Sequence, residues 1–329
     1  MSEQPEIGTL VVASAGSDAQ AEQVIAQRDA SERGLAFLWT GTRSATAGLS
    51  RLKEARVPVF YVPDKLAFGL RTLLNYHQWR DSRQTDGFGQ CPAITQDQEQ
   101  TVAGLKALGR TAFSEHESKR LISAWGVPVA QEITASDPAT AVTAAESIRF
   151  PVAVKADSPD ILHKTEAGVV RLGLNSAEQV RSAVEEVMSN AALAAPGGTI
   201  NGALVQEMVS GGVEVIVGVS YDQQLGPVLL FGTGGVTVEV YNDVALRLCP
   251  ISRAEAVEMI DQVKGSRLLK GFRGSPSADV DALADVLVQV SHMASQLEGT
   301  LSELDINPLM VLPEGQGVRA VDALAVFRE

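Results

Sequence analysis

The sequence predicts an α/β protein built from two parts. Residues 7–80 alternate short apolar strands with helical stretches, residues 81–110 are polar and irregular, and periodic patterns resume at Ser114. The chain has 329 residues, 45% of them hydrophobic, so it is long enough to form more than one core. We therefore expect a first domain over residues 1–85, a linker over 86–110 and a second domain over 111–329.

The first part has the pattern of a small parallel sheet. Its expected strands are residues 7–12, 35–39 and 58–61. Its expected helices are residues 19–33, 44–55 and 64–79. This alternation predicts parallel strands with helices on the faces of the sheet. Three strands make a small sheet, and a parallel sheet needs cover on both faces and both edges. The first part therefore looks like half of a larger doubly wound domain.

The linker and the start of the second part are distinguished by their polar residues. A short docking helix is expected at residues 102–108 of the linker. A longer helix is expected over residues 114–125, where Ser114 is the N-cap and Glu117 closes a capping box.

Strands and one strong helix are expected in the rest of the second part. The strands are residues 151–156, 202–208 and 213–220. The helix is marked by a stripe of apolar residues, namely Val280, Leu283, Leu287, Val290, Ala294 and Leu297. His292 lies off this stripe, so we expect it to face solvent.

Two strands near the C-terminus bring polar side chains together. Alternation along residues 303–308 places Asp305 and Asn307 on one face of a strand. A turn at residues 313–316 sets a register in which Asn307 lies opposite Asp322, with Cβ atoms about 5 Å apart. Carboxylate and amide oxygens at this spacing suit Mg²⁺. The alternative is a hairpin whose polar face is simply solvated.

A lysine and a histidine mark a second polar region. Lys155 is the charged residue of the apolar strand 151–156. A lysine is rarely buried without a partner; a phosphate would be one, and otherwise the side chain extends to solvent. The following loop, residues 157–168, carries His163 beside Lys164. A histidine in such a loop could act as a nucleophile, contact a phosphate or have no role.

Glycine-containing segments also suggest contact with an anion. Residues 231–236 read Phe-Gly-Thr-Gly-Gly-Val, without the third glycine of G-x-G-x-x-G and without a following helix pattern. A Rossmann turn is therefore rejected, and a P-loop is rejected because no G-x-x-x-x-G-K-[ST] occurs. Arg273 lies between Gly271 and Gly274, an arrangement that suits a phosphate contact.

Composition excludes several classes of partner and location. A net charge of −13 argues against nucleic acid and anionic membranes. The N-terminus has no secretory signal pattern, and no run approaches the length of a membrane span. Cys91 and Cys249 are far apart in sequence and suggest neither a disulfide framework nor a zinc site. We expect a cytoplasmic protein.

In this order, the motifs resemble the ATP-grasp domain of the ADP-forming acetyl-CoA and acyl-CoA synthetases, relatives of succinyl-CoA synthetase. The matching segments are residues 114–115, 126–128, 151–155, 158–164, 205–208, 218–222, 231–239, 269–274, 305–308 and 321–323. Residues 7–80 resemble the closing part of the same family's CoA-ligase domain. The resemblance implies an α/β protein with an ATP-grasp fold, preceded by a partial flavodoxin-like parallel unit.

The resemblance also implies a reaction. Acyl-CoA, ADP and phosphate would be exchanged with acid, CoA and ATP, and a phosphohistidine would carry the phosphoryl group between two sites. His163 would be the phosphohistidine of the nucleotide-binding part, Asp305 would orient it, and Arg273 would contact a phosphate. Asn307 and Asp322 would hold Mg²⁺.

The same resemblance implies a nucleotide site for ATP or ADP. Lys155 and Lys164 would bind the nucleotide, Lys155 at the phosphates. Gln206, Glu207 and Val209 would line the adenine hinge. The ribose or phosphate side would be contacted by Glu214.

The chain departs from the family pattern in two ways. Gly168 is followed by Val169, where the family usually has a second glycine. The CoA-binding Rossmann domain and the Ser-His-Thr-Gly segment are also missing, so a CoA-ligase (alpha-like) partner subunit is expected to supply them. Two other functions stay open: an ATP-grasp carboxylate ligase that uses another nucleophile, and a non-catalytic regulatory subunit that binds Mg-ATP.

Overall fold

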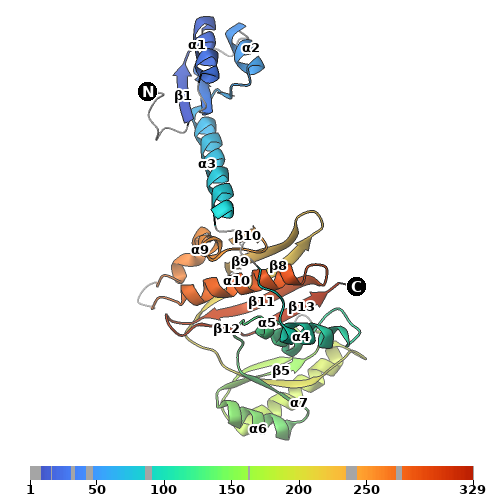
Figure 1. Cartoon of the computed structure of the whole chain (residues 1–329). Helices are drawn as coiled ribbons and strands as arrows, with labels where there is room; N and C mark the ends of the chain where they lie inside the picture. Colours follow the sequence, from blue (N-terminus) through green and yellow to red (C-terminus); the bar gives the residue numbers. More distant parts are fainter. Residues whose placement is uncertain are drawn as a thin grey trace. The chain divides into compact units, whose positions relative to one another are not determined.

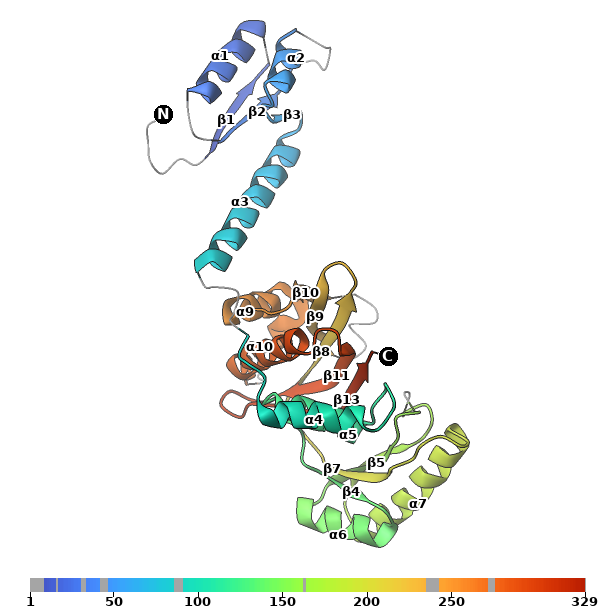
Figure 2. The same ribbon diagram turned by 45° about the vertical axis from the view of Figure 1, so that its right-hand side comes forward.

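The computed structural model divides the chain into two compact units, Met1–Gly87 and Phe88–Glu329, each of which is described by itself. Figures 1 and 2 show the helices and strands of both units. None of the helices in the described part of the chain is long and apolar enough to cross a membrane. The structure describes residues 9–15, 17–30, 34–41, 47–85, 91–161, 164–234, 243–271 and 276–328.

The first unit is the expected parallel sheet. Its strands are β1 (Thr9–Ser14), β2 (Gly34–Trp39) and β3 (Val59–Phe60), hydrogen-bonded in the order β1-β2-β3. The central strand β2 is buried on both faces. Phe37 and Trp39 pack against one pair of helices, and Leu38 packs against Leu66 of a third helix. Two-sided burial explains why β2 is a continuous apolar run.

Three helices cover this sheet, with bounds that differ slightly from those expected. They are α1 (Asp18–Asp29), α2 (Ala47–Glu54) and α3 (Pro63–Thr85). Residues of α1 and α2 lie in the cluster around Phe37, whereas the first turns of α3 cover the other face. Helix α3 runs six residues beyond the predicted end at residue 79, because neither glycine nor proline interrupts that stretch.

The second unit contains two sheets, and the smaller one has four strands in the order β4-β7-β5-β6. Two helices, α6 (Pro138–Ile148) and α7 (Ala177–Ala194), pack on one face of it (Figure 2). The opposite face stays free of this helix layer and carries Lys155 and Gln206. The strands are β4 (Glu132–Ala135), β5 (Val152–Asp157), β6 (Val170–Leu174) and β7 (Gly202–Glu207).

The larger sheet has six strands, in the order β10-β9-β8-β11-β12, with β13 also paired to β11. Its strands are β8 (Val213–Asp222), β9 (Gly226–Thr233), β10 (Val244–Leu248), β11 (Leu301–Val311), β12 (Val318–Ala320) and β13 (Ala323–Phe327). Helices α9 (Arg253–Gln262) and α10 (Val280–Gln296) pack against it (Figure 1), and the 3-10 helix η1 (Lys264–Leu268) contacts β9. The expected stripe of α10 is confirmed, since Leu283, Leu287 and Val290 are fully buried there.

Helix α5 (Glu115–Ala124) begins as its sequence predicts. Ser114 is the N-cap, and its hydroxyl accepts from the Glu117 amide while the Glu117 carboxylate accepts from the Ser114 amide. Asp157, at the end of β5, adds a second cap, because its carboxylate accepts from the Ser114 hydroxyl and the His116 amide. The start of α5 is therefore anchored to the smaller sheet.

The C-terminal hairpin has the expected register. Leu309 pairs with Ala320 and Ile306 with Ala323, and the Asn307 amide donates to the Asp322 carbonyl at 3.2 Å. The second strand is not continuous, however, and breaks at residues 321–322 between β12 and β13. Pro308 explains the break, because a proline has no N–H for the ladder and the pairing of β11 with β8 shifts at the same place.

Part of the expected linker is a helix that belongs to the second unit. Helix α4 (Gln96–Lys106) begins six residues before the docking helix that the sequence suggested. Thr95 and Gln98 form a capping box, which explains the earlier start in a glutamine-rich segment. Val102 and Leu105 are buried in the core of the larger sheet.

The expectation that His292 faces solvent is wrong. Its ring Nε2 is buried and has no hydrogen-bond partner among the described residues. Its carbonyl accepts from the Cys91 thiol at 3.4 Å, so the segment that precedes α4 lies over this side of α10. Burial lowers the pKa of His292. The stripe rule failed because a second layer of chain covers the face of α10 that looked exposed.

Candidate active site

A buried glutamate lies at the centre of the candidate site. The side chain of Glu115 is 1% exposed, and three lysines donate to its carboxylate. Lys119 and Lys155 donate to Oε1 at 2.6 and 2.7 Å, and Lys164 donates to Oε2 at 2.5 Å. Burial opposes the charge on Glu115, but the lysines outweigh it and hold the pKa well below its usual value. Glu115 is therefore ionised.

The strand pattern brings Lys155 to this glutamate. Val152, Val154 and Ala156 of β5 face the helices α6 and α7, so Lys155 points to the opposite face. There its ammonium also donates to the Val321 carbonyl at 3.2 Å, and the Gln206 amide donates to the same carbonyl at 2.8 Å. Burial lowers the pKa of Lys155 more than the charge of Glu115 raises it.

Next to Glu115 is a cavity of about 470 Å³ that brings together both expected metal ligands and the aspartate expected to orient the phosphohistidine. Asp305, Asn307 and Asp322 line it together with Lys164 and Glu115. Both oxygens of Asp322 accept from Lys164, at 2.8 and 2.9 Å. The cavity is also lined by Phe113, Ser158, Pro159, Ile161, Ala323 and Leu324.

The carboxylates of this cavity are poorly compensated. Burial, with the charges of Asp322 and Glu303, raises the pKa of Asp305 to about 6. Burial and the charge of Glu115 also raise the pKa of Asp322, even though Lys164 is bound to it. Carboxylates whose charge is disfavoured in this way suit a divalent cation, and Asn307 adds a neutral amide oxygen. The donor set therefore fits Mg²⁺.

The polar loop after β5 contributes residues to the 470 Å³ cavity. His163 and Arg273 lie outside the described residues. Ile161 and Lys164, on either side of His163 in the sequence, both line the 470 Å³ cavity. Although burial alone would lower it, the charges of Glu115 and Asp322 raise the pKa of Lys164, which is therefore a cation.

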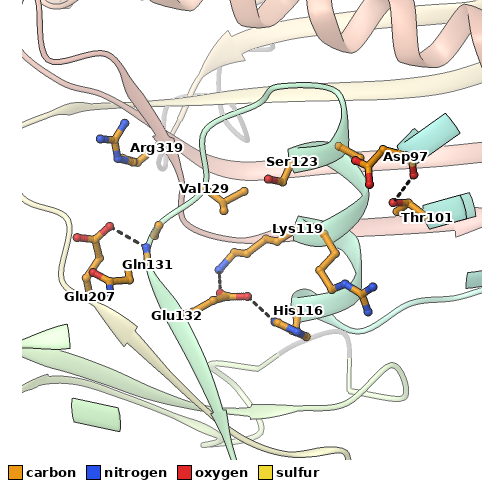
Figure 3. Close-up of a pocket in the computed structure, with 13 residues that line it drawn as sticks. Asp97, Thr101, His116, Lys119, Ser123, Val129, Gln131, Glu132, Glu207 and Arg319 are labelled. Carbon is orange, nitrogen blue, oxygen red and sulfur yellow. Dashed lines mark hydrogen bonds and ion pairs between the residues drawn. The ribbon is translucent and has the colours of Figure 1, made fainter. Parts of the chain in front are cut away.

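Glu207 lines a second cavity of about 760 Å³ (Figure 3). Its carboxylate accepts from the Gln131 amide at 2.8 Å. On the far wall, Lys119 and His116 both point toward Glu132 and contact its two oxygens at 2.6 and 2.9 Å. Lys119 also binds Glu115, so a continuous chain of ion pairs joins the two cavities.

The remaining expected nucleotide residues lie apart from both cavities. Val209 belongs to the crossover between the two sheets, and Glu214 is exposed near the start of β8. The Glu214 carbonyl accepts from the Gly234 amide at 2.9 Å, which places this strand beside the glycine-containing segment. Neither residue is among those that line the 470 or the 760 Å³ cavity.

Comparisons with known proteins agree with these observations. The family model described as an ATP-grasp domain matches residues 104–326. The beta subunit of the ADP-forming acetate–CoA ligase II of Pyrococcus furiosus is 40% identical over 227 residues, which cover 69% of this chain and 96% of that subunit. The chain belongs to this ATP-grasp family.

Two further proteins of the ADP-forming ligase group match well. The ADP-forming acetate–CoA ligase I of Archaeoglobus fulgidus is 36% identical over 267 residues, which cover 81% of this chain and 38% of that protein. An acetyl-coenzyme A synthetase 1 of Ca. Korarchaeum cryptofilum was solved with coenzyme A and Mg-AMPPCP, its phosphohistidine segment pointing towards the nucleotide binding site. Its sequence is 36% identical to this one. The structural match covers 70% of this chain and 100% of the synthetase chain, with a TM-score of 0.61.

The ATP-grasp match confirms the fold expected for the second part. Both sheets of the second unit lie within residues 104–326 or one residue beyond them, and so do all the candidate site residues. The chain spans nearly the whole of the Pyrococcus subunit but under two-fifths of the Archaeoglobus ligase. The small parallel sheet of the first unit is confirmed as well.

Sequence reasoning missed Glu115, Lys119 and Glu132. Glu115 and Lys119 are spaced i, i+4, which marks a helical ion pair but usually an exposed one. A carboxylate in the first turn of a helix likewise has an ordinary explanation in the helix dipole. The partners that enclose this pair, Glu132 of β4 and Lys155 of β5, come from distant parts of the chain, which residue spacing does not reveal.

Proposed function

We propose that this chain is the nucleotide-handling subunit of an ADP-forming acyl-CoA synthetase. Its reaction would be the transfer of a phosphoryl group between ATP or ADP and the imidazole of His163. The observation that carries the proposal is the 470 Å³ cavity, where Asp305, Asn307 and Asp322 meet Lys164 beside the Glu115 cluster. Phosphoryl transfer needs alignment and charge neutralisation, which these groups supply.

In the proposed step, the bond between the γ-phosphorus of ATP and its bridging oxygen breaks as a nitrogen of His163 bonds to phosphorus. ADP leaves, and the reverse step forms ATP. Lys155 and Lys164 would lie against the phosphates, where their charge offsets that of the transferred group. Asp305, mostly ionised at neutral pH, would accept from the other ring N–H of His163 and so orient the ring.

Asn307 and Asp322 would hold Mg²⁺, which supplies charge neutralisation at the phosphate oxygens when it is bound. Arg273 would contact a phosphate. The nucleotide base and ribose would extend toward the crossover between the sheets, where Gln206, Glu207, Val209 and Glu214 are the proposed contacts. Of these, Gln206 is joined to the cluster, because it shares the Val321 carbonyl with Lys155.

A partner subunit is part of the proposal. The Pyrococcus relative is named as a subunit beta, and the Korarchaeum synthetase was solved with coenzyme A. We infer that an alpha-like CoA-ligase partner binds CoA and the acyl group, and exchanges the phosphoryl group with this chain through His163. The incomplete parallel sheet of the first unit is a surface that such a partner could extend.

The test is phosphorylation of the purified chain with Mg²⁺ and γ-labelled ATP. We expect label that is acid-labile and base-stable, as phosphohistidine is, and that is lost in His163→Ala. His77→Ala is the matched control, since His77 is exposed on α3 and should leave the label unchanged. Nucleotide affinity should be nearly equal in all three proteins.

Two results would reject the proposal. Label that persists in His163→Ala would remove the histidine from the transfer. An unlabelled wild-type chain that still binds Mg-ATP, and stays unlabelled when a CoA-ligase subunit is added, would favour the non-catalytic regulatory function. A ligase that uses another nucleophile would turn over without CoA and would not need His163.

A further inference from the structure

Glu115 has no role in the phosphoryl transfer proposed above, yet its carboxylate binds three lysines of the site. It stands in the first turn of α5, anchored to β5 through Ser114 and Asp157. Its two oxygens divide the lysines between them. Oε1 binds Lys119 and Lys155, whereas Oε2 binds Lys164.

The division of oxygens matters because the lysines come from different parts of the fold. Lys155 belongs to β5, and Lys164 belongs to the polar loop that includes His163. Lys164 also binds both oxygens of Asp322, which lies between β12 and β13 of the larger sheet. The Glu115 carboxylate therefore connects a strand of the smaller sheet to the loop directly, and to the larger sheet through Lys164 and Asp322.

The arrangement has a consequence for Asp322. When Asp322 binds a cation, its bonds to Lys164 must weaken, and a buried ammonium without a partner is costly. Glu115 Oε2 remains as a partner for Lys164 at that moment. Lys155, 5% exposed, likewise keeps a partner while its other contact, the Val321 carbonyl, is replaced by phosphate.

We propose that Glu115 is a positioning residue that holds Lys155 and Lys164 in place for the nucleotide phosphates. The assignment rests on the proposed function of the cavity. Glu115 need not touch the nucleotide, because it acts through the two ammonium groups. It also leaves Asp322 free for the cation, since Lys164 has a second carboxylate to bind.

If Glu115 acted only through its negative charge, its removal would change the affinity for Mg-ATP in the direction opposite to that expected for a positioning residue. Deleting a negative charge beside a negatively charged ligand should tighten binding. Loss of positioning should weaken it, because Lys164 would then bind Asp322 alone and Lys155 would lose its carboxylate. The sign of the change in affinity therefore separates the two roles.

The experiment measures the affinity of the full chain for Mg-ATP and for AMP by calorimetry, in three variants. Glu115→Gln removes the charge at constant shape, and Glu115→Asp keeps the charge but shortens the side chain by about 1.5 Å. Glu117→Gln is the matched control. It removes a carboxylate from the same helical turn, bound to Arg110 rather than to the lysines, and glutamine at this position still completes a capping box.

We expect both Glu115 variants to bind Mg-ATP at least about tenfold more weakly, equivalent to about 1.4 kcal/mol. Affinity for AMP, which lacks the two terminal phosphates, should change less than about threefold. Glu117→Gln should alter neither. Glu115→Asp is expected to fold even if the glutamine variant does not, because the lysines keep an anion nearby.

Tighter or unchanged Mg-ATP binding in a folded Glu115 variant would overturn the assignment. So would an equal loss of affinity for Mg-ATP and AMP, which would indicate a general distortion of the site. If the wild-type chain binds no nucleotide at all, the proposed function fails and this assignment fails with it. If the wild-type chain binds Mg-ATP and the Glu115 variants bind it equally well, only the positioning role of Glu115 is rejected.

Discussion

Replacing Asp305 by asparagine should stabilise the protein while it impairs phosphoryl transfer. The pKa of this carboxyl is raised from its ordinary value of 3.8 to about 6, first by burial and then by Asp322 and Glu303. The ionised form is therefore disfavoured in the folded state. At pH 7.5 the ionised carboxyl lowers the free energy of unfolding by at most about 3 kcal/mol, since each unit of pKa difference between the folded and unfolded chain is worth about 1.4 kcal/mol.

Partial exposure of Asp305 reduces this figure through solvent screening. We therefore expect the free energy of unfolding of Asp305→Asn to exceed that of the wild type by about 1–2 kcal/mol. For a unit of this size that gain raises Tm by about 2–8 °C. Asparagine keeps an oxygen that can accept from the Asn307 side chain, the hydrogen bond that favours the charged form in the wild type. Phosphorylation of His163 should fall because the asparagine carries no negative charge to offset the positive charge that the ring gains when its nitrogen bonds to phosphorus.

The pH dependence of stability provides a second measurement of the same effect. Between pH about 4 and 6 the native carboxyl holds a proton that the unfolded chain has lost, so stability rises as pH falls through this window. In Asp305→Asn that contribution is absent, so the free energy of unfolding should change less with pH between about 4 and 6. Calorimetric unfolding at pH 5 and 7.5 measures both quantities.

Glu303→Gln is the control for the Asp305 prediction. Glu303 lies two residues away on the same face of β11 but is exposed, and its charge is a smaller cause of the raised Asp305 pKa than burial, so its replacement should raise Tm by less than Asp305→Asn does. A variant Asp305→Asn that is less stable than the wild type at pH 7.5 would refute the reasoning. An unchanged pH slope between 5 and 7.5 would refute it as well.

Two further predictions test the other charged groups. Asp322→Ala should weaken Mg-nucleotide binding by at least about tenfold, because it removes one of the two proposed cation ligands; an unchanged affinity in calorimetry would reject the hairpin metal site. The hydrogen bond to Glu132 raises the pKa of His116 above 6.5 despite partial burial. His116→Ala should therefore cost up to about 1 kcal/mol at pH 6 and progressively less as pH rises through the folded pKa, as urea unfolding at pH 6 and 8.5 would show.

Local rules predicted the parts of the fold that depend on short stretches of chain. The capping box of α5 needs only Ser114 and Glu117, which are three residues apart. The register that places Asn307 beside Asp322 follows from a four-residue turn and strand alternation. Neither inference requires knowledge of what packs against the segment.

The centre of the site could not be predicted in this way. Glu115 and Lys155 are forty positions apart and meet because α5 is anchored to the end of β5. Their sequence neighbourhoods, a polar helix start and an apolar strand, give no sign of a shared contact. His292 shows the same limit, since the chain around Cys91 covers it from two hundred residues away.

The balance of charge in the cluster bears on the form in which a nucleotide binds. Three carboxylates of the described residues line the 470 Å³ cavity, namely Glu115, Asp305 and Asp322. The three lysines that donate to Glu115 face these three carboxylates and also Glu132, which binds Lys119, so their ammonium groups are already compensated. A triphosphate that entered alone would add negative charge to a region where the pKa values of two carboxyls are already raised. The cluster therefore favours a nucleotide that brings its own divalent cation, for which Asp322 and Asn307 are the oxygen ligands that we propose.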